Sequence, residues 1–174
     1  MKNKRGQIWV ETVVYTLIAF ALIAAVLSFV KPKIQELQDK AIIEQSISML
    51  KDIDSTVIEI IQGGAGNKRK LEVGIKKGDL IFDGENNAII FKIESNYLYS
   101  EIGKEIVDGN LIIKTLKKGE KNLVILNRTY QDYNLTFKGE EETKTLSKAS
   151  TSYNIFLTNK GKINNKWNID VELG

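Results

Sequence analysis

The strongest constraint on the fold of this chain is an uncharged, mostly apolar run of 19 residues, 12–30, near its N-terminus. As a helix rising about 1.5 Å per residue, the run is roughly 28 Å long, which matches the ~30 Å hydrocarbon core of a bilayer. It contains no Pro or Gly, and Lys2, Lys4 and Arg5 precede it. Because basic residues flank a membrane span on its cytoplasmic side, we expect the N-terminus inside and the C-terminus outside the cytoplasmic membrane.

The apolar run does not have the features of an ordinary secretory signal. The apolar core of such a signal is shorter and leads to a small-residue cleavage site. This run instead ends in Phe29-Val30-Lys31-Pro32-Lys33, with no small-residue pattern. We therefore expect the protein to keep this segment as a transmembrane or filament-core helix over 8–30.

A second helical pattern follows Pro32. Apolar residues recur there mostly at steps of three and four, which predicts an amphipathic helix over 33–61 with one buried stripe. Pro32 predicts the one kink, because proline lacks a backbone donor, and Gly63-Gly64 predicts the end of the helix. The expected N-terminal helix thus covers 7–62. Its predicted stripe comprises Ile34, Leu37, Ala41, Ile47, Leu50, Ile53, Val57 and Ile60.

From Leu71 onward the chain consists of short β-like runs separated by turn residues. With no long helical pattern between them, these runs predict an antiparallel, sandwich-like β domain over 67–174. We interpret 63–70 as a loop, and place turns at glycine sites such as Asp108-Gly109 and Lys160-Gly161. The fold class is therefore α+β, a long N-terminal helix followed by an all-β domain. The predicted strands are LEVGI, LIFD, AIIFKIE, KEIV, NLIIKTL, NLVILN, YNLTF, SYNIFLT and WNIDVEL.

Composition excludes most enzyme chemistry. The chain has no Cys and no His, so it lacks thiol nucleophiles, disulfides, Cys/His zinc sites and the commonest general base. Three of its 25 basic residues precede the apolar run, and the remaining 22 are balanced by 22 acidic residues. This balance argues against a nucleic-acid binder. We expect no enzyme activity, no catalytic residue, no cofactor and no metal ion.

The residues just before the apolar run form the most specific motif. They read Lys4-Arg5-Gly6-Gln7-Ile8-Trp9-Val10-Glu11: a basic pair, a glycine, and one carboxylate at the start of the apolar stretch. This order resembles the class III signal of archaeal type IV pilin-like proteins, in which a membrane prepilin peptidase cuts after the glycine and the apolar helix stays on the mature protein. The resemblance implies a cleaved leader, 1–6, processing between Gly6 and Gln7, and Glu11 at the fifth mature position. Archaellins typically lack this glutamate, so the resemblance favours a pilin.

Glu11 also requires a partner on physical grounds. A carboxylate facing lipid costs up to about 2.5–3.5 kcal/mol at full depth. In a bundle of identical helices, the amino group created at Gln7 of a neighbouring subunit supplies the opposite charge. We therefore interpret Glu11 as a subunit-assembly residue. The simpler interpretation is an interfacial side chain that reaches water.

Other motifs have simpler interpretations. Asn127 and Asn134 each begin an Asn-x-Thr tripeptide, which makes them candidate N-glycosylation acceptors on the external side. Since the chain is rich in Asn, two unmodified asparagines are an equal alternative. We expect the acidic run 140–142 to be a solvated loop rather than a calcium site, and 83–87 to be a turn.

Taken with the resemblance, the sequence predicts a structural subunit of an archaeal type IV pilus-like surface filament. The expected partners are further copies in a helical homopolymer, the prepilin peptidase, the assembly platform and its ATPase, and the cytoplasmic membrane before assembly. No nucleic acid is expected. Two alternatives stay open: a minor pilin or pseudopilin of a secretion or adhesion system, and an uncleaved, signal-anchored extracellular binding domain.

Overall fold

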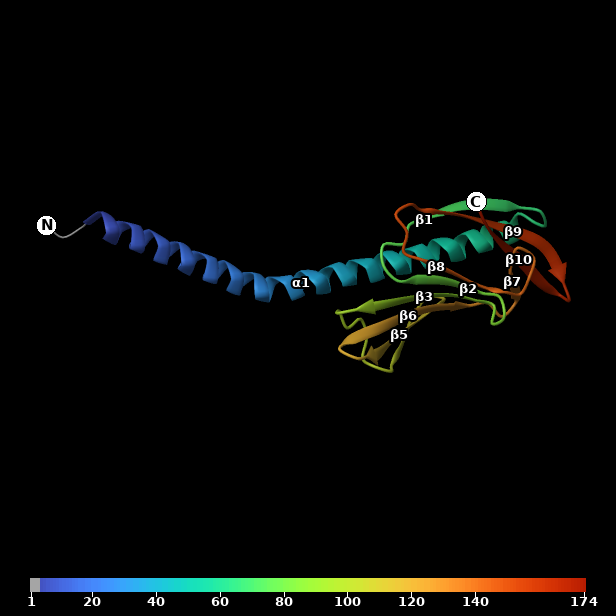
Figure 1. Ribbon diagram of the computed structural model, residues 1–174. Coiled ribbons are helices and arrows are strands. Elements are labelled where there is room, and N and C mark those ends of the chain that lie inside the picture. Colours follow the sequence, from blue (N-terminus) through green and yellow to red (C-terminus); the bar gives the residue numbers. More distant parts are fainter. Residues whose placement is uncertain (1–3) are drawn as a thin grey trace.

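The computed structural model describes the backbone of residues 4–174 and the side chains of residues 9–174. The predicted leader, 1–6, and the processing site at Gly6 and Gln7 lie outside the residues described in full. The described chain forms one long helix, α1 (Lys4–Gln62), followed by a β domain of two sheets (Figure 1). This arrangement confirms the predicted α+β fold class.

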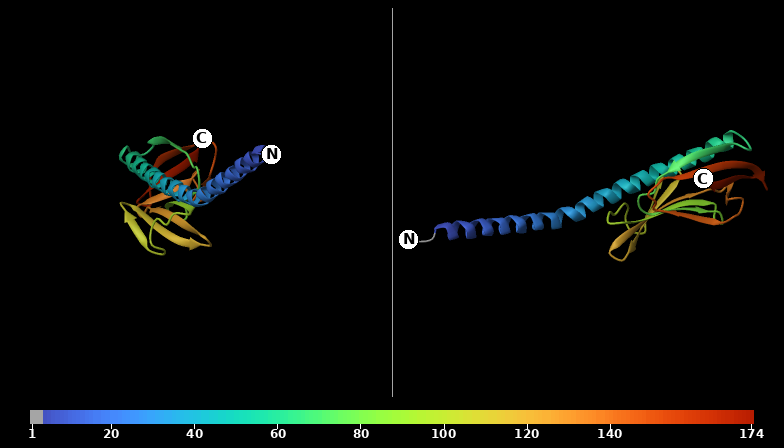
Figure 2. Two further views of the ribbon diagram at one scale, coloured as in Figure 1. Left: turned by 90° about the vertical axis from the view of Figure 1, so that its left-hand side faces the viewer. Right: turned by 45° about the horizontal axis from the view of Figure 1, so that its top comes forward.

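Helix α1 is continuous and has Pro32 near its midpoint. Figure 1 shows the helix changing direction about halfway along, as expected where a proline removes a backbone donor and crowds the preceding turn. In Figure 2 the N-terminal half projects away from the β domain, whereas the C-terminal half lies along it. The helix ends at the predicted glycine pair, where Gly64 has a φ of 83°, a conformation that glycine adopts readily.

Ten strands of the described chain form the two sheets. The four-stranded sheet has the order β1-β9-β10-β7, and the six-stranded sheet has the order β4-β5-β6-β3-β2-β8. The strands are β1 (Lys68–Val73), β2 (Asp79–Asp83), β3 (Ala88–Ser95), β4 (Glu105–Asp108), β5 (Leu111–Lys118), β6 (Lys121–Thr129), β7 (Tyr133–Phe137), β8 (Thr143–Ser147), β9 (Tyr153–Ile163) and β10 (Lys166–Leu173).

The pairing of β7 with β10 corrects the expectation of a wholly antiparallel domain, because these two strands are parallel. The named strands otherwise pair antiparallel. Parallel strands need a long crossover connection. The chain provides one here, since β8 and β9 lie between β7 and β10 in the sequence.

The C-terminal half of α1 lies between the two sheets and contributes to their common core (Figure 1). Its buried apolar side chains form one hydrophobic cluster with residues of both sheets, such as Phe91 of β3 and Leu157 of β9. The helix is therefore part of the domain's fold, as the amphipathic pattern predicts. The buried apolar residues of the helix are Ile43, Ile47, Leu50, Ile53, Val57 and Ile60.

The buried stripe begins later than the periodicity predicts. Ile34, Leu37 and Ala41 are exposed, whereas Ile43 is fully buried. The first helix side chain that the β domain buries is Asp39. Positions 34 and 37 therefore precede the part of α1 that the sheets cover, although they share the helical period of the stripe.

Two edge strands differ from the prediction. Residues 68–70 begin β1 rather than forming a loop, and β8 lies in a segment for which no strand was expected. Each strand lies at a sheet edge and has one buried side chain, Val73 in β1 and Leu146 in β8. Charged edge strands of this kind discourage pairing with other chains, and residues 68–70 and β8 lack the alternation of apolar residues that identifies a strand in a sequence.

The hairpin between β9 and β10 turns at Asn164-Asn165, not at Lys160-Gly161. Both asparagines have positive φ, 50° and 66°, as a tight hairpin turn requires and asparagine tolerates. Gly161, with a φ of 91°, lies inside β9 where the register with β10 shifts. The glycine therefore forms a β-bulge instead of a turn.

We expect Leu50→Ala to lower the free energy of unfolding of the β domain by about 2–5 kcal/mol, because Leu50 is only 1% exposed in the common core. Leu37→Ala is the matched control on the same helix and should change that free energy by less than about 0.5 kcal/mol, because Leu37 is 61% exposed. Urea unfolding in mild detergent, followed by Trp167 fluorescence in a Trp9→Phe background, measures both. Equal losses from the two variants would contradict the placement of α1 in the core.

Candidate functional site

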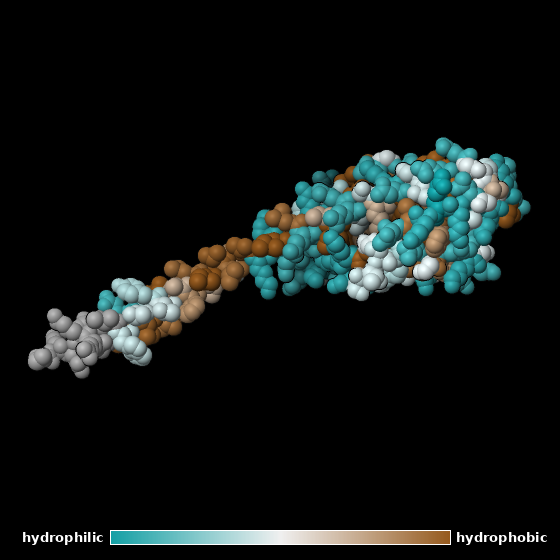
Figure 3. Space-filling view, turned by 90° about the horizontal axis from the view of Figure 1, so that it is seen from above, coloured by the Kyte–Doolittle hydropathy of each residue, from teal (hydrophilic) through white to brown (hydrophobic). Residues whose placement is uncertain are grey.

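The N-terminal half of α1 is the surface of this protein with the greatest need for a partner. From Trp9 to Leu37, every large apolar side chain is exposed. Figure 3 shows this segment, hereafter the free half (9–37), as a largely hydrophobic column leading into a mostly hydrophilic domain. The helix is long and apolar enough to cross a membrane. Since soluble monomers rarely expose so large an apolar surface, the free half marks an interaction site.

Two hydroxyl groups within the free half form hydrogen bonds inside the helix. The Oγ1 of Thr16 donates to the carbonyl of Thr12 at 2.8 Å, and the Oγ of Ser28 donates to the carbonyl of Ala25 at 2.7 Å. These bonds remove the need for water around either hydroxyl. The free half is therefore compatible with lipid and with an apolar bundle of helices.

Glu11 is the only acidic residue of the sequence before Glu36. Its side chain is exposed on the free half, and no other side chain among the described residues pairs with it. Trp9, two residues earlier, is 71% exposed. The structure thus places Glu11 where a cation from another molecule has access to it.

The first polar contact between α1 and the β domain is made by Asp39. This carboxylate is buried and forms an ion pair with Lys77. It also accepts hydrogen bonds from the backbone nitrogen of Asn96 at 2.7 Å and from Nδ2 of Asn96 at 3.0 Å. The carboxylate of Asp39 thus binds the segment before β2 and the segment after β3. These contacts fix the position of the β domain along the axis of α1.

Asp54 makes a second contact about four turns further along α1. Its carboxylate accepts from Nε of Arg128 at 2.7 Å and from Nδ2 of Asn110 at 3.1 Å. The guanidinium of Arg128 lies 4.4 Å from the ring centre of Tyr130. Burial, followed by the nearby charge of Asp54, raises the pKa of the Tyr130 phenol well above its ordinary value. Tyr130 therefore stays neutral, and its ring packs against the guanidinium of the ion pair.

A third contact lies at the C-terminal end of α1, where Nδ2 of Asn159 donates to the carbonyl of Ile60 at 3.1 Å. We refer to Asp39, Asp54 and Asn159 as the helix anchors. Sequence reasoning missed them because a carboxylate beside an apolar stripe, or an asparagine within a strand, has the same pattern whether it faces water or a partner. Removing one partner of a buried ion pair typically costs about 3–5 kcal/mol, so the Asp54–Arg128 pair in particular holds the register of the helix against the sheets.

The two candidate glycosylation acceptors lie in strands rather than in loops. Asn127 is half-buried in β6, and the Oδ1 of its side-chain amide accepts from Oγ1 of Thr129 at 3.4 Å. Asn134 is half-buried in β7, and Thr136 of the same tripeptide is buried and donates to Asp170 at 2.9 Å. Modification at Asn134 would therefore have to precede folding. Glycosylation at either residue stays a prediction.

The remaining polar clusters have structural explanations. The carboxylate of Asp83 accepts from the backbone nitrogen of Asn86 at 3.0 Å, which stabilises the predicted turn at 83–87. The run 140–142 is exposed, and the part of the chain that the structure describes contains no group of three or more carboxylates placed to hold a metal ion. A crevice of about 330 Å³ lies between α1, β1 and the segment 74–77, where the Ser46 hydroxyl already donates to Ile42 at 2.8 Å.

These features define the architecture: one long helix whose N-terminal part is apolar and long enough to span a membrane, and whose C-terminal part packs between the two sheets of a β domain. No protein-family model, curated protein or solved structure matches this chain. The functional argument therefore depends on the free half, Glu11 and the helix anchors.

Proposed function

We propose that this protein is a structural subunit of an archaeal type IV pilus-like surface filament. The observation that carries the proposal is the division of α1 into two parts. Its C-terminal half is buried between the sheets, while every large apolar side chain of the free half is exposed. A subunit that is first held in a membrane and then bundled through the same surface requires this division.

The proposed assembly exchanges lipid contacts for contacts between helices. Because lipid and a helix bundle are similarly apolar, the hydrophobic effect alone gives the transfer no direction. Close packing of the free halves, pairing of Glu11 with the amino group at Gln7 of a neighbour, and contacts between β domains would favour the filament. An assembly platform and its ATPase would supply the remaining work.

The proposal also sets the sidedness of the chain. The basic cluster of Lys2, Lys4 and Arg5 would lie in the cytoplasm, and the β domain outside the cytoplasmic membrane. After cleavage by a prepilin peptidase and assembly, the β domain would cover the filament on the cell surface. A minor pilin or pseudopilin would share the signal and the helix but occur at low abundance. A signal-anchored binding domain would keep residues 1–6.

Coexpression with the cognate prepilin peptidase should shorten the protein by residues 1–6 and leave Gln7 as its first residue. Gly6→Val should block this cleavage, because the peptidase reads the glycine at the cut. Intact mass and terminal-peptide mass of the membrane-extracted protein measure both outcomes. Retention of Met1 beside an active peptidase, or a start beyond Val30, would contradict the pilin proposal.

A further inference from the structure

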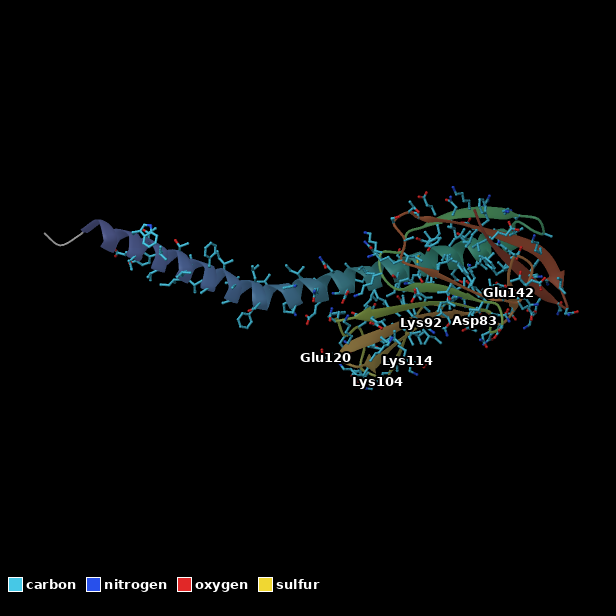
Figure 4. All side chains as sticks on the ribbon, viewed as in Figure 1. Asp83, Lys92, Lys104, Lys114, Glu120 and Glu142 are labelled. Carbon is cyan, nitrogen blue, oxygen red and sulfur yellow. The ribbon has the colours of Figure 1, made fainter. Side chains whose placement is uncertain are left out.

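Three segments lie at the end of the β domain that is closest to the free half, beside the loop that follows β8 (148–152). These are the β5–β6 turn (117–121), the loop after β3 (96–104) and the pair Lys76-Lys77, together called the near tip. Asn96 hydrogen bonds to Asp39, and its neighbour Ser95 pairs with Asn122, directly after the β5–β6 turn. Figure 4 shows Glu120 and Lys104 at this end of the domain.

The opposite end of the domain, the far tip, is the β9–β10 turn with its flanking residues (162–166). It lies beyond the C-terminal end of α1, where the backbone nitrogen of Gly66 donates to the carbonyl of Asn159 at 2.7 Å. The two tips offer a matched pair. Each has two exposed lysines four positions apart, Lys117 and Lys121 at the near tip and Lys162 and Lys166 at the far tip.

The near tip lies close to the apolar span. Asp39, which marks its height on α1, is nine residues beyond Val30, or about 13 Å along the helix. A headgroup layer extends roughly 5–7 Å beyond the hydrocarbon on each side of a bilayer. Measured along α1, the level of Asp39 therefore lies within about one Debye length, 8–10 Å, of the phosphate groups.

The charge of the near tip is only partly neutralised. Lys77, Lys104 and Lys118 form ion pairs with Asp39, Glu101 and Glu94, respectively. The hydrogen bond from Lys118 lowers the pKa of Glu94, which keeps that pair charged. By contrast, three exposed lysines of the near tip, Lys76, Lys117 and Lys121, have no carboxylate partner within 4.0 Å among the described residues. The same turn carries one exposed carboxylate outside these ion pairs, Glu120, so the three lysines exceed it by two charges.

We propose that, while the protein is in the membrane, the near tip docks on anionic lipid headgroups through Lys76, Lys117 and Lys121. Phosphate headgroups complement these ammonium groups, whereas an electrically neutral leaflet offers no net attraction. The docking rests on the membrane insertion in the proposed function, but not on filament assembly. It holds the β domain in one orientation, with the exposed Leu98 and Ile102 of the same tip near the headgroups.

The test uses the full chain at low protein density in vesicles of pure phosphatidylcholine and of phosphatidylcholine mixed with phosphatidylglycerol. The chain has no cysteine, so Glu120→Cys and Ile163→Cys place a single dye on the near and far tips. We expect energy transfer from the Glu120→Cys dye to a headgroup acceptor to rise in the anionic vesicles. The rise should disappear at about 1 M salt, where the Debye length is about 3 Å. Transfer from the Ile163→Cys dye should not rise.

Charge variants then identify the contact. Lys117→Gln with Lys121→Gln should abolish the rise at the near tip, whereas Lys162→Gln with Lys166→Gln should preserve it. Equal transfer in the two vesicle types from an inserted protein would overturn the docking and leave the proposed function intact. Transfer that follows protein density rather than lipid charge would assign the near tip to a second copy of the chain and overturn the lipid proposal. Failure of the chain to stay with vesicles of either composition would overturn both proposals.

Discussion

Replacing Glu11 with Val is expected to abolish filaments while the protein still enters the membrane and is still processed after Gly6. In an assembled bundle, the variant would leave the amino group of a neighbour unpaired in apolar surroundings. By analogy with broken buried ion pairs, the loss is about 3–5 kcal/mol for each subunit contact. Insertion should be unchanged or improved, because the variant no longer carries a charge at the edge of the span.

Glu44→Val provides the matched control for this experiment. Glu44 is an exposed carboxylate on the same helix and lies 3.7 Å from Lys40, a surface pair worth about 0.3–0.5 kcal/mol. Its loss should not affect assembly. Filaments sheared from cells are quantified beside the processed, membrane-bound subunit. Normal filaments from the Glu11→Val protein would mean that Glu11 is only an interfacial side chain.

A fragment of residues 33–174 is expected to fold as a soluble, monomeric, β-rich domain, whereas a fragment of residues 66–174 should be unfolded. The longer fragment keeps all six buried apolar side chains of α1, and the shorter one loses them together with Asp39 and Asp54. Burying one such side chain contributes about 1.5–3 kcal/mol. Six of them therefore rival the whole stability of an ordinary domain, about 5–15 kcal/mol.

Thermal unfolding followed by circular dichroism, with size-exclusion chromatography, measures both fragments. A fragment of residues 38–174 is the control, because it lacks the exposed Ile34 and Leu37 but keeps the buried stripe. Its unfolding temperature should match that of the fragment beginning at residue 33. If the fragment beginning at residue 66 also unfolds at this temperature, the helix does not stabilise the core.

The large-scale arrangement could be predicted from the sequence because its signals are local. The length of the apolar run predicts the length of the apolar part of the helix. The helix also ends at Gln62, directly before the glycine pair that predicts its end. The buried stripe was correct from Ile47 to Ile60, but its beginning was not. Helical periodicity reports which face is apolar, whereas the point at which a sheet begins to cover that face depends on a distant part of the chain.

The missed elements share a dependence on contacts that are far apart in the sequence. The β7–β10 pairing joins strands separated by two others, and no local pattern specifies a strand's partner. β8 has one buried residue, Leu146, which is too little for a period to be recognised. The sequence offered two turn signals here, Lys160-Gly161 and Asn164-Asn165. The asparagines form the turn, whereas Gly161 lies in a β-bulge.

The candidate site divides in the same way. The apolar run 12–30 and Glu11 are visible in the sequence because an uncharged run and a lone carboxylate need no tertiary information. The helix anchors are not, since Asp54 becomes an anchor only because Arg128 of β6 is brought beside it. The near tip also requires the fold, which returns the β5–β6 turn to the level of Asp39.

The unbroken course of α1 determines how the molecule transmits mechanical load. Strands of both sheets run roughly along the part of the helix that they enclose (Figure 1). Tension on the free half therefore acts in shear, so that many side-chain contacts must yield together instead of separating one after another. A slip of one helical turn, about 5.4 Å, would pull Asp39 from Lys77 and Asp54 from Arg128 at the same moment. The ion pairs of the two buried carboxylates thus resist sliding of the helix and transmit tension from it to the β sandwich.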